Sequence, residues 1–319
     1  MKAAVLYEPG QAEQLKYVDV PTPDTKPGWS LIKVMGRGLT YAEVDARNGM
    51  SPTGKIECPK ILGIECVGVI EKTTDPERLP VGQKAVSMGG GMGIMFDGSY
   101  ADYTLLPNKQ IVPIQSNLSW EDLAAISESY YTAYRSLLQL KIKDAKTLLV
   151  RAATSSVGLA ALKLARVMNP EIKVFGTSRR AEAKQTILDF GFDGFVQDKD
   201  NELQTSDSYD AIFDLVGCSS ALDSMKHLNP FGIVSVTGDM GRVPVLEQFN
   251  PIVAIPNDRY MTSFANFVIE EKPFDDLLKL IEDNNVDVSP VKVFHLKDIV
   301  EAHKFLEGHQ HPGKVVVLP

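Results

Sequence analysis

A short turn of small residues is the first place where this sequence can do chemistry. Residues 147–150 form an apolar run of strand type, residues 152–156 are small, and residues 157–165 carry apolar side chains at helical spacing. Small side chains let a ligand approach the backbone, and the first N–H groups of a helix have no partner inside the helix. Because such turns bind phosphate oxygens, the pattern predicts the start of a nucleotide-binding βαβ unit.

The turn is a reduced form of the glycine fingerprint of dinucleotide-binding proteins. The spacing G-x-x-G-x-x-G is occupied by Ala152, Ser155 and Gly158, so a single glycine is kept. Alanine and serine are still small, and two serines add hydroxyl donors. The residues of the turn alone are equally compatible with an ordinary strand–helix connection. We predict that the pyrophosphate of a dinucleotide is bound by Ser155, Ser156, Val157 and Gly158.

A basic segment follows the second strand of this unit. Sites that prefer NAD place an acid about 20 residues beyond the turn, on the ribose hydroxyl. Here the run 172–176 leads into Ser178, Arg179 and Arg180, with Lys184 a turn later. Guanidinium groups bind a phosphate and cannot replace a carboxylate. The alternative is a solvated basic start of a helix. We favour NADPH as the cofactor, selected by these four residues.

Composition limits the possible partners. A chain of 319 residues with 44% hydrophobic and 23% charged residues is typical of a globular enzyme with about two domains. A net charge of −8 argues against nucleic acid and anionic membranes as partners. No run approaches the ~18 apolar residues of a membrane span. The absence of a signal-peptide core and three widely spaced cysteines, Cys58, Cys66 and Cys218, predict a cytoplasmic protein without disulfides.

The first 115 residues have the pattern of a compact β domain. Short alternating or apolar runs recur between turn-forming stretches, and they predict an antiparallel barrel or sandwich. Helical spacing begins at the capping box of Ser119 and continues to about residue 139. We therefore expect a domain boundary near residue 118. The expected strands are 2–7, 16–20, 30–35, 67–71, 84–88 and 100–106.

From residue 147 onwards, strand-like and helical segments alternate. This alternation predicts a doubly wound parallel sheet with right-handed crossovers, so the fold class is α/β. The predicted domains are 1–118 and 119–260, followed by a C-terminal segment 261–319. The expected strands are 147–151, 172–177, 194–197, 210–216, 232–237 and 314–318, and the expected late helices are 274–284 and 296–307.

With these elements in order, the sequence resembles the medium-chain dehydrogenase/reductase superfamily, and within it the zinc-less quinone oxidoreductases (zeta-crystallin-like). The resemblance implies a GroES-like N-terminal barrel and a Rossmann domain, with the segment 261–319 completing the Rossmann sheet and returning to the first domain. It also implies dimers or tetramers formed through the edge of the Rossmann sheet, of which we expect a homodimer. It covers nearly the whole chain. The segments that carry it are 2–5, 38–43, 47–49, 62–68, 98–103, 156–160 and 313–318.

The resemblance also predicts that no metal is bound. Zinc members of the superfamily carry a histidine ligand at the place of Ile64 and a cysteine near Leu39, and their four-cysteine lobe is missing here. Structural and catalytic zinc sites need such ligands. All histidines lie in the second half of the chain: His227, His295, His303, His309 and His311.

The implied reaction is hydride transfer from the nicotinamide to a quinone, or to the β-carbon of an α,β-unsaturated carbonyl. Candidate groups to polarise the acceptor oxygen are the hydroxyls of Tyr41, Thr40 and Tyr131. Thr40 stands where many relatives have asparagine. Tyr41 is the preferred candidate, although an aromatic side chain at this place could equally line a pocket.

The resemblance implies further cofactor contacts at the carboxyl ends of strands and beside the nicotinamide. Thr132 could instead bond back to its own helical turn, Phe264 could be a core residue, and Lys314 could form a structural ion pair with Glu65. The glycine-rich segment 89–97 is a mobile flap or a surface turn. The implied contacts are Thr132, Val216, Gly217, Gly238, Phe264 and Lys314.

Three functions are compatible with these observations. The first is an NADPH-dependent reductase of quinones or enones. The second is a non-catalytic NADPH-binding protein, either a redox sensor or a structural protein, which the reduced glycine turn favours. The third, a zinc alcohol dehydrogenase, conflicts with the missing ligands. The preserved length and the basic segment favour the first.

Overall fold

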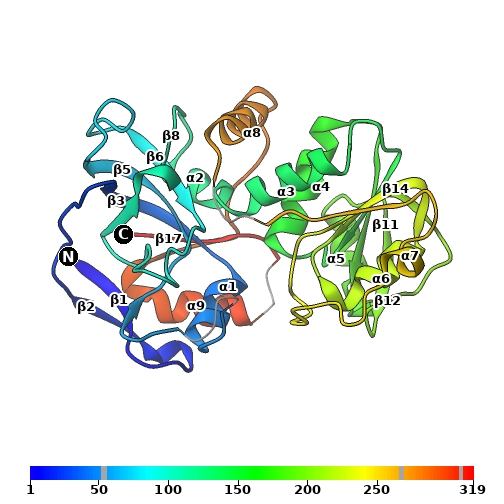
Figure 1. Ribbon diagram of the computed structural model, residues 1–319, viewed down its shortest axis with the longest axis horizontal. Coiled ribbons are helices and arrows are strands. Elements are labelled where there is room, and N and C mark those ends of the chain that lie inside the picture. Colours follow the sequence, from blue (N-terminus) through cyan, green and yellow to red (C-terminus); the bar gives the residue numbers. More distant parts are fainter. Residues whose placement is uncertain (52–55, 266–268, 309–311) are drawn as a thin grey trace. The chain divides into compact units, whose positions relative to one another are not determined.

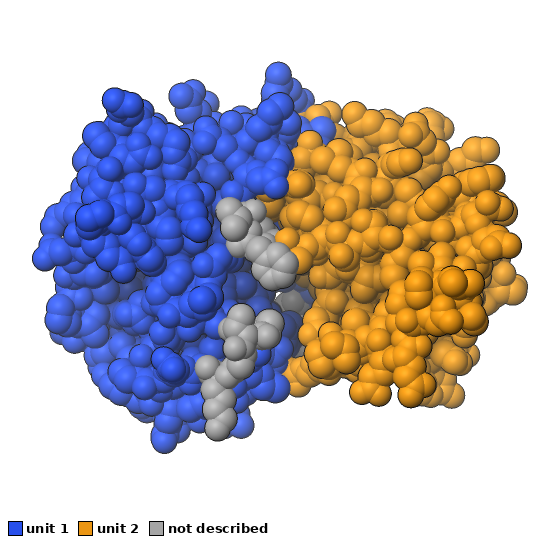
Figure 2. Space-filling view, in the orientation of Figure 1, with its two compact units in different colours: residues 1–129, 266–283, 287–319 blue, residues 130–265, 284–286 orange. Residues whose placement is uncertain are grey.

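The computed structural model describes residues 1–51, 56–265, 269–308 and 312–319. The chain divides into two compact units, shown in different colours in Figure 2. Unit 1 comprises residues 1–129, 266–283 and 287–319, and unit 2 comprises residues 130–265 and 284–286. Each unit has its own sheets and its own hydrophobic core.

Unit 1 contains the β-rich domain predicted from the first 115 residues. Neighbouring strands are antiparallel except for the last pair, β16 and β17. The three-stranded sheet has the order β2 (Leu15–Asp19), β1 (Lys2–Leu6), β4 (Lys60–Ile61). The seven-stranded sheet has the order β16 (Lys292–His295), β17 (Val315–Leu318), β3 (Trp29–Leu39), β5 (Glu65–Lys72), β6 (Lys84–Met88), β8 (Val112–Pro113), and β7 (Tyr103–Pro107) also pairs with β3.

Unit 2 is a doubly wound parallel sheet, as the alternating pattern predicted (Figure 1). Its order is β12 (Glu202–Leu203), β11 (Gly194–Lys199), β10 (Lys173–Ser178), β9 (Thr147–Arg151), β13 (Tyr209–Asp214), β14 (Leu228–Val236), β15 (Tyr260–Thr262). All neighbouring pairs are parallel except β11 and β12. Without the terminal hairpin strand β12, this is the strand order 3-2-1-4-5-6 of Rossmann domains, which bind ligands where the order reverses, between β9 and β13.

Both units also contain helices. Unit 1 contains α1 (Tyr41–Arg47), α2 (Trp120–Ile126), α8 (Glu271–Asp283) and α9 (Ile299–Glu307). Unit 2 contains α4 (Ser156–Met168), α5 (Lys184–Asp189), α6 (Cys218–Lys226), α7 (Pro251–Ala254) and nearly all of α3 (Ser129–Gln139). Short 3-10 turns lie at Ala12–Gln14, Asn108–Gln110, Ala181–Ala183 and Leu296–Asp298.

The two units separate later in the chain than the predicted boundary at 118. Helix α2 belongs to unit 1 because it packs closely on strand β3. A Cβ atom built at Gly36 would lie 3.0 Å from the Cβ of Ala124 and 3.1 Å from the carbonyl oxygen of Trp120. The predicted helical stretch 119–139 is therefore split into α2 and α3 at the place where the chain passes from one unit to the other.

A buried polar cluster joins α1 to α9 inside unit 1. The Arg47 guanidinium donates to both carboxylate oxygens of Glu307, at 2.9 and 2.8 Å. Its Nη1 also lies 3.2 Å from Nδ1 of His303, whose Nε2 lies 3.0 Å from the Tyr100 hydroxyl. Because Nδ1 faces a guanidinium donor, it must be the acceptor, and Nε2 carries the proton. Burial, assisted by Arg47, lowers the pKa of His303 to about 3.

Because His303 is neutral in the folded protein, it makes the free energy of unfolding depend on pH. In the unfolded chain His303 binds a proton near pH 6.5, and in the folded chain only near pH 3. The unfolded state therefore binds more protons between these values, and stability is lost as the pH falls below 6.5. From pH 7 to pH 5 the loss from this residue is about 2 kcal/mol. Urea unfolding of wild type and His303→Gln at both pH values measures it, and an identical pH dependence in both proteins contradicts the assignment.

Candidate functional site

The predicted phosphate turn lies between β9 and α4 of unit 2. Ala152 has φ of +61°, in the left-handed region, and begins the turn. Ser155 is the N-cap of α4: its hydroxyl donates to the Ala152 carbonyl at 2.8 Å and accepts from the Gly158 N–H at 3.1 Å. A Cβ atom at Gly158 would come within 2.8 Å of the carbonyl oxygens of Ala152 and Ala153. The fingerprint glycine is therefore kept where helix and turn are in contact.

The geometry of this turn fits a pyrophosphate, but it gives the four predicted residues of the turn different roles. The Gly158 N–H bonds to the Ser155 hydroxyl, so it is not available to a ligand. Ser156 and Val157 are the first two residues of α4, the part of a helix whose N–H groups point toward a bound anion. Helix α4 has 13 residues, so its dipole adds positive potential at this end. Ser155 shapes the turn through its two hydrogen bonds.

The predicted basic segment follows directly after β10. Arg179, Arg180 and Lys184 are exposed, and Thr177 is buried. Two hydrogen bonds fix the backbone: the Arg180 N–H donates to the Ser178 hydroxyl at 3.2 Å, and Gln197 on β11 donates to the Arg179 carbonyl at 3.4 Å. The end of β10 is thus followed by exposed cations, with one exposed carboxylate, Glu182, between Arg180 and Lys184.

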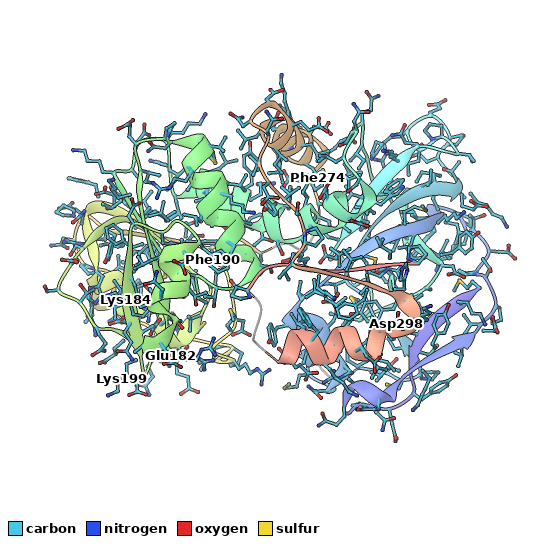
Figure 3. The ribbon with its side chains drawn as sticks, turned by 180° about the vertical axis from the view of Figure 1, so that it is seen from behind. Glu182, Lys184, Phe190, Lys199, Phe274 and Asp298 are labelled. Atoms are coloured by element: carbon cyan, nitrogen blue, oxygen red, sulfur yellow. The ribbon has the colours of Figure 1, made fainter. Side chains whose placement is uncertain are left out.

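The structure adds one cation that the sequence prediction missed. Ser178 pairs with Gln197 on β11, and the exposed Lys199 lies two residues further, on the same face of the strand. Figure 3 shows Lys184, Glu182 and Lys199 in the same region of unit 2. The signal was present in the sequence, because the carboxyl ends of neighbouring parallel strands meet at one edge of the sheet. Glu182 is exposed and reduces the positive charge of the segment.

A buried arginine connects the strand ends beneath the turn. Arg151, the last residue of β9, is fully buried. It donates to both carboxylate oxygens of Asp198 at 2.9 and 2.8 Å, and to Asp223 at 2.9 Å. It also donates to the Ser224 hydroxyl at 3.0 Å and to the Asn201 carbonyl at 2.9 Å. One guanidinium therefore ties β9 to the end of β11 and to α6, and it neutralises a carboxylate next to the basic segment.

The backbone after the next strand, β13, is held in place by hydrogen bonds to Asp214 and by close contacts at two glycines. The Asp214 carboxylate accepts from the N–H groups of Val216 and Gly217 at 2.9 and 3.1 Å. Gly217 has φ of +101°, and a Cβ atom there would lie 2.5 Å from the Gly238 carbonyl oxygen. A Cβ atom at Gly238 would lie 2.0 Å from the Leu215 carbonyl oxygen. Glycine is required at both positions because the ends of β13 and β14 approach so closely.

Helix α3 presents the remaining predicted residues of unit 2. Tyr131 is fully buried, its hydroxyl accepts from Arg135 at 2.9 Å, and its ring meets the Phe264 ring edge to face at 6.1 Å between centroids. The Arg135 guanidinium carbon lies 5.2 Å from the Phe264 centroid. Thr132 is buried, and its carbonyl accepts from the Ser136 hydroxyl at 2.8 Å. Tyr131, Thr132 and Phe264 therefore lie in one neighbourhood, where Tyr131 has a cation as its partner.

In unit 1, both predicted hydroxyls near residue 40 have protein partners. Tyr41 donates to the carbonyl of Leu306 on α9 at 2.8 Å, which fits a structural role. Thr40 is the N-cap of α1: its hydroxyl donates to Glu43 at 2.7 Å and accepts from the Ala42 N–H at 3.3 Å. Thr40 is half-buried, so its oxygen connects a buried carboxyl with the surface of the unit.

Lys314 lies in the ion pair that the sequence offered as the alternative to cofactor binding. It is 5% exposed, and its ammonium group lies 2.5 Å from Glu65 and 3.9 Å from Glu128. Burial by itself would lower the pKa of Lys314, but the attraction of these carboxylates raises it. The ammonium group therefore stays charged, and in unit 1 it is surrounded by carboxylates.

Two further expectations concern the barrel and metals. In the segment 89–97, four glycines have positive φ, Met92 is fully buried and Phe96 packs edge to face on Trp29.

Burial raises the pKa of the Cys66 thiol to about 12, which makes it a poor nucleophile. The described residues contain no group of three His, Cys, Asp or Glu side chains arranged to hold a metal ion. His309 and His311 lie outside the described residues.

Comparison with protein families gives a match for two parts of the chain. Residues 26–116 match the alcohol dehydrogenase GroES-like domain, and residues 183–317 match the zinc-binding dehydrogenase domain. The chain belongs to the medium-chain dehydrogenase/reductase superfamily. Within this superfamily, its relatives and structural neighbours support the quinone oxidoreductase branch, and they support an oxidoreductase activity.

Several relatives in the superfamily match over their full length or most of it. Quinone oxidoreductase of Pongo abelii is 26% identical over 100% of this chain and 98% of the relative. The chloroplastic NADPH-dependent alkenal/one oxidoreductase of Arabidopsis thaliana is 26% identical over 100% of this chain and 80% of the relative. An NAD-dependent alcohol dehydrogenase of Saccharolobus solfataricus is also 26% identical, over 100% of both.

A solved structure and a much longer relative complete the comparison. The quinone oxidoreductase of Coxiella burnetii has a TM-score of 0.82 at 24% identity, with 100% of this chain and 99% of that chain covered, which establishes the fold. A phenolphthiocerol/phthiocerol polyketide synthase of Mycobacterium tuberculosis is 23% identical over 97% of this chain, and the chain spans 14% of its length. No helix among the described residues has the length and apolar character needed to cross a membrane.

Removing the Arg151 side chain should destabilise unit 2 strongly. Arg151→Met leaves Asp198 buried without its cation, and breaking a buried pair in this way costs about 3–5 kcal/mol. Lys173→Met is the control, since Lys173 is 65% exposed and its pair with Asp193 should be worth less than about 1 kcal/mol. Urea unfolding followed by circular dichroism compares the two. Equal costs for both substitutions would be inconsistent with the role assigned to Arg151.

Proposed function

We propose that this protein is a zinc-independent oxidoreductase that uses NADPH to reduce quinones or α,β-unsaturated carbonyl compounds. The observation that carries the proposal is the exposed basic segment after β10, next to a turn that fits a pyrophosphate. When bound, the nicotinamide would supply a hydride for the acceptor. The quinone oxidoreductase and alkenal/one oxidoreductase relatives support this acceptor class.

The residues proposed to hold the cofactor are those of unit 2. The N–H groups of Ser156 and Val157 would bind the pyrophosphate, with Ser155 and Gly158 shaping the turn. Arg179, with Arg180, Lys184 and Ser178, would bind the phosphate of the adenosine ribose, and their guanidinium and ammonium groups suit a dianion. Backbone atoms of Val216, Gly217 and Gly238, the Thr132 hydroxyl and the Phe264 side chain complete the set proposed for unit 2. The family resemblance adds Lys314 of unit 1, whose ammonium group pairs with Glu65 in this structure.

Zinc independence is proposed on the nature of the side chains. The position of the histidine ligand in zinc members is Ile64, whose N–H donates to Glu43 at 3.2 Å. An isoleucine side chain cannot bind a metal, so polarisation of the acceptor oxygen would fall to hydroxyl groups. All three candidate hydroxyls have protein partners. Tyr41 donates to the Leu306 carbonyl and Tyr131 accepts from Arg135, whereas Thr40 donates to Glu43, a carboxyl group that can itself be protonated, and this favours Thr40.

A homodimer is proposed from the edge of the Rossmann sheet. Strand β15 is the last strand of the sheet, and exposed apolar side chains lie on it and on neighbouring segments of unit 2. Burying such side chains is favourable, so a second copy would stabilise this edge. The exposed residues include Phe231, Ile252, Val253 and Tyr260.

The cofactor assignment predicts a difference between two nucleotides. In Arg179→Ala/Lys184→Ala, the Kd for NADPH should rise about tenfold or more, because two charged contacts to one phosphate are lost. The Kd for NADH should stay nearly unchanged. Fluorescence titration measures both values. Lys173→Ala, at the opposite end of β10, is the control and should alter neither.

Equal weakening of NADPH and NADH would contradict the assignment of the basic segment. Oxidation of NADPH with a panel of quinones and enals then tests the reaction itself. Tight NADPH binding without turnover of any acceptor would favour the second function, a non-catalytic NADPH-binding protein. Metal analysis of the active protein tests zinc independence, and stoichiometric zinc would overturn it.

A further inference from the structure

A cluster of carboxyl groups lies beneath the start of α1 in unit 1. Glu43 and Glu65 are fully buried, and Lys314 is 5% exposed. The lysine ammonium lies 2.5 Å from Glu65 and 3.9 Å from Glu128. Three carboxyl groups thus share the neighbourhood of one cation. If all three were ionised, the buried cluster would carry an excess negative charge, which is costly in an environment of low polarity.

Hydrogen bonds determine which carboxyl group is left without a cation. Glu65 receives the lysine, the Ser127 hydroxyl and the Glu128 N–H at 2.9 Å. Glu43 receives neutral donors: the Thr40 N–H at 2.8 Å, the Thr40 hydroxyl at 2.7 Å and the Ile64 N–H at 3.2 Å. None of these direct partners of Glu43 is a cation. A proton held by this cluster is therefore expected on Glu43.

The electrostatics of Glu43 agree with this placement. Burial, followed by repulsion from Glu65, raises its pKa to about 7, while Lys314 and the Thr40 hydrogen bonds act in the opposite direction. Arg47 lies on the same helix, where it pairs with Glu307, and the Tyr100 hydroxyl lies near the cluster with a pKa raised by burial. Near neutral pH, Glu43 is thus close to half protonated and can give or take a proton.

Thr40 provides the route by which this proton can leave. When Glu43 is ionised, the Thr40 hydroxyl donates to it, and when Glu43 is protonated, its O–H can donate to Thr40 instead. In the second arrangement the hydrogen of the half-buried threonine hydroxyl is free to turn toward another acceptor. The pair can therefore pass a proton between the buried carboxyl and the surface of unit 1.

We propose that Thr40 is the proton donor to the reduced acceptor and that Glu43 is the reservoir that resupplies it, an inference that rests on the proposed function. After hydride addition, an enone becomes an enolate and a quinone becomes a hydroquinone anion. The oxyanion takes the Thr40 hydroxyl proton, Thr40 takes the proton of the Glu43 carboxylic acid, and Glu43 is left as a carboxylate. Water reprotonates Glu43 after the product leaves, so each cycle consumes one proton.

An ordinary capping box is the competing explanation, and it provides a sharp test. Glu43 accepts the N–H of its own N-cap residue, as glutamate does at the third position of many helices. Glutamine serves equally well in a capping box. Glu43→Gln should therefore keep the cap and the fold but cannot exchange a proton. Asp122→Asn is the matched control, because Asp122 is the third residue of α2 and bonds to its N-cap Ser119 outside the cluster.

The first experiment needs neither cofactor nor acceptor. An infrared pH titration of the protein alone should show a protonated carboxyl that ionises with a midpoint near pH 7, and this signal should be lost in Glu43→Gln and kept in Asp122→Asn. The stability of the wild type relative to Glu43→Gln should also fall as the pH rises from 4.5 to 7, because the folded wild type holds an extra proton on Glu43 in this range, whereas the opposite contribution of His303 is common to both proteins. A carboxyl group that is already ionised at pH 5 would overturn the proposal.

The second experiment follows kcat and KM for a quinone and an enal against pH. Wild-type kcat should fall above pH 7, whereas Glu43→Gln should have kcat lowered about tenfold or more, no such pH limb and an unchanged KM. Thr40→Val should show the same loss and Thr40→Ser should restore activity. An active Glu43→Gln with the wild-type pH profile would overturn the relay alone. NADPH binding without reduction by the wild type would overturn the proposed function.

Discussion

A charge placed inside a protein has to be compensated where it lies, and in both units of this chain a buried cation is paired with carboxylates from other segments. In unit 2, Arg151 is compensated by Asp198 and Asp223. In unit 1, Lys314 is compensated by Glu65. Removing water from these groups costs several kcal/mol each, which only close, well-oriented partners can offset. The partners come from different segments, so the compensation also fixes how those segments meet. Arg37 is an exception, since its buried guanidinium has no hydrogen-bond partner among the described residues and burial lowers its pKa to about 10.

In unit 2 this constraint acts at the edge of the sheet where a nucleotide would bind. The turn that begins at Ala152 starts one residue after Arg151, so the guanidinium that joins β9, β11 and α6 also fixes the origin of the turn. The same contact neutralises Asp198, which would otherwise place a negative charge beside the exposed Lys199. A buried ion pair thereby contributes to a basic surface that suits a phosphorylated ribose.

In unit 1 the same constraint leaves the buried carboxyl groups with different partners. Because Lys314 compensates Glu65, Glu43 remains in the same buried cluster with neutral donors alone. A residue that caps a helix is thereby given a pKa near neutrality. The contrast with Tyr41 is informative, since its hydroxyl donates to a backbone carbonyl of α9 and acts in packing the barrel.

The sequence by itself determined the features that depend on neighbouring residues. Alternation of apolar runs and helical stretches gave the α/β class and the strands of both units, because hydrophobic periodicity acts within a single element. The turn 152–158 and the cations after Ser178 could also be predicted from the sequence, because each of them directly follows the end of a strand. The tertiary structure decided which distant charges meet. Arg151 and Asp198 are 47 residues apart, and Glu65 and Lys314 are 249 apart. The sequence could offer the second of these pairs only through the family resemblance, because burial and pairing of charges depend on how the sheets close and not on local pattern.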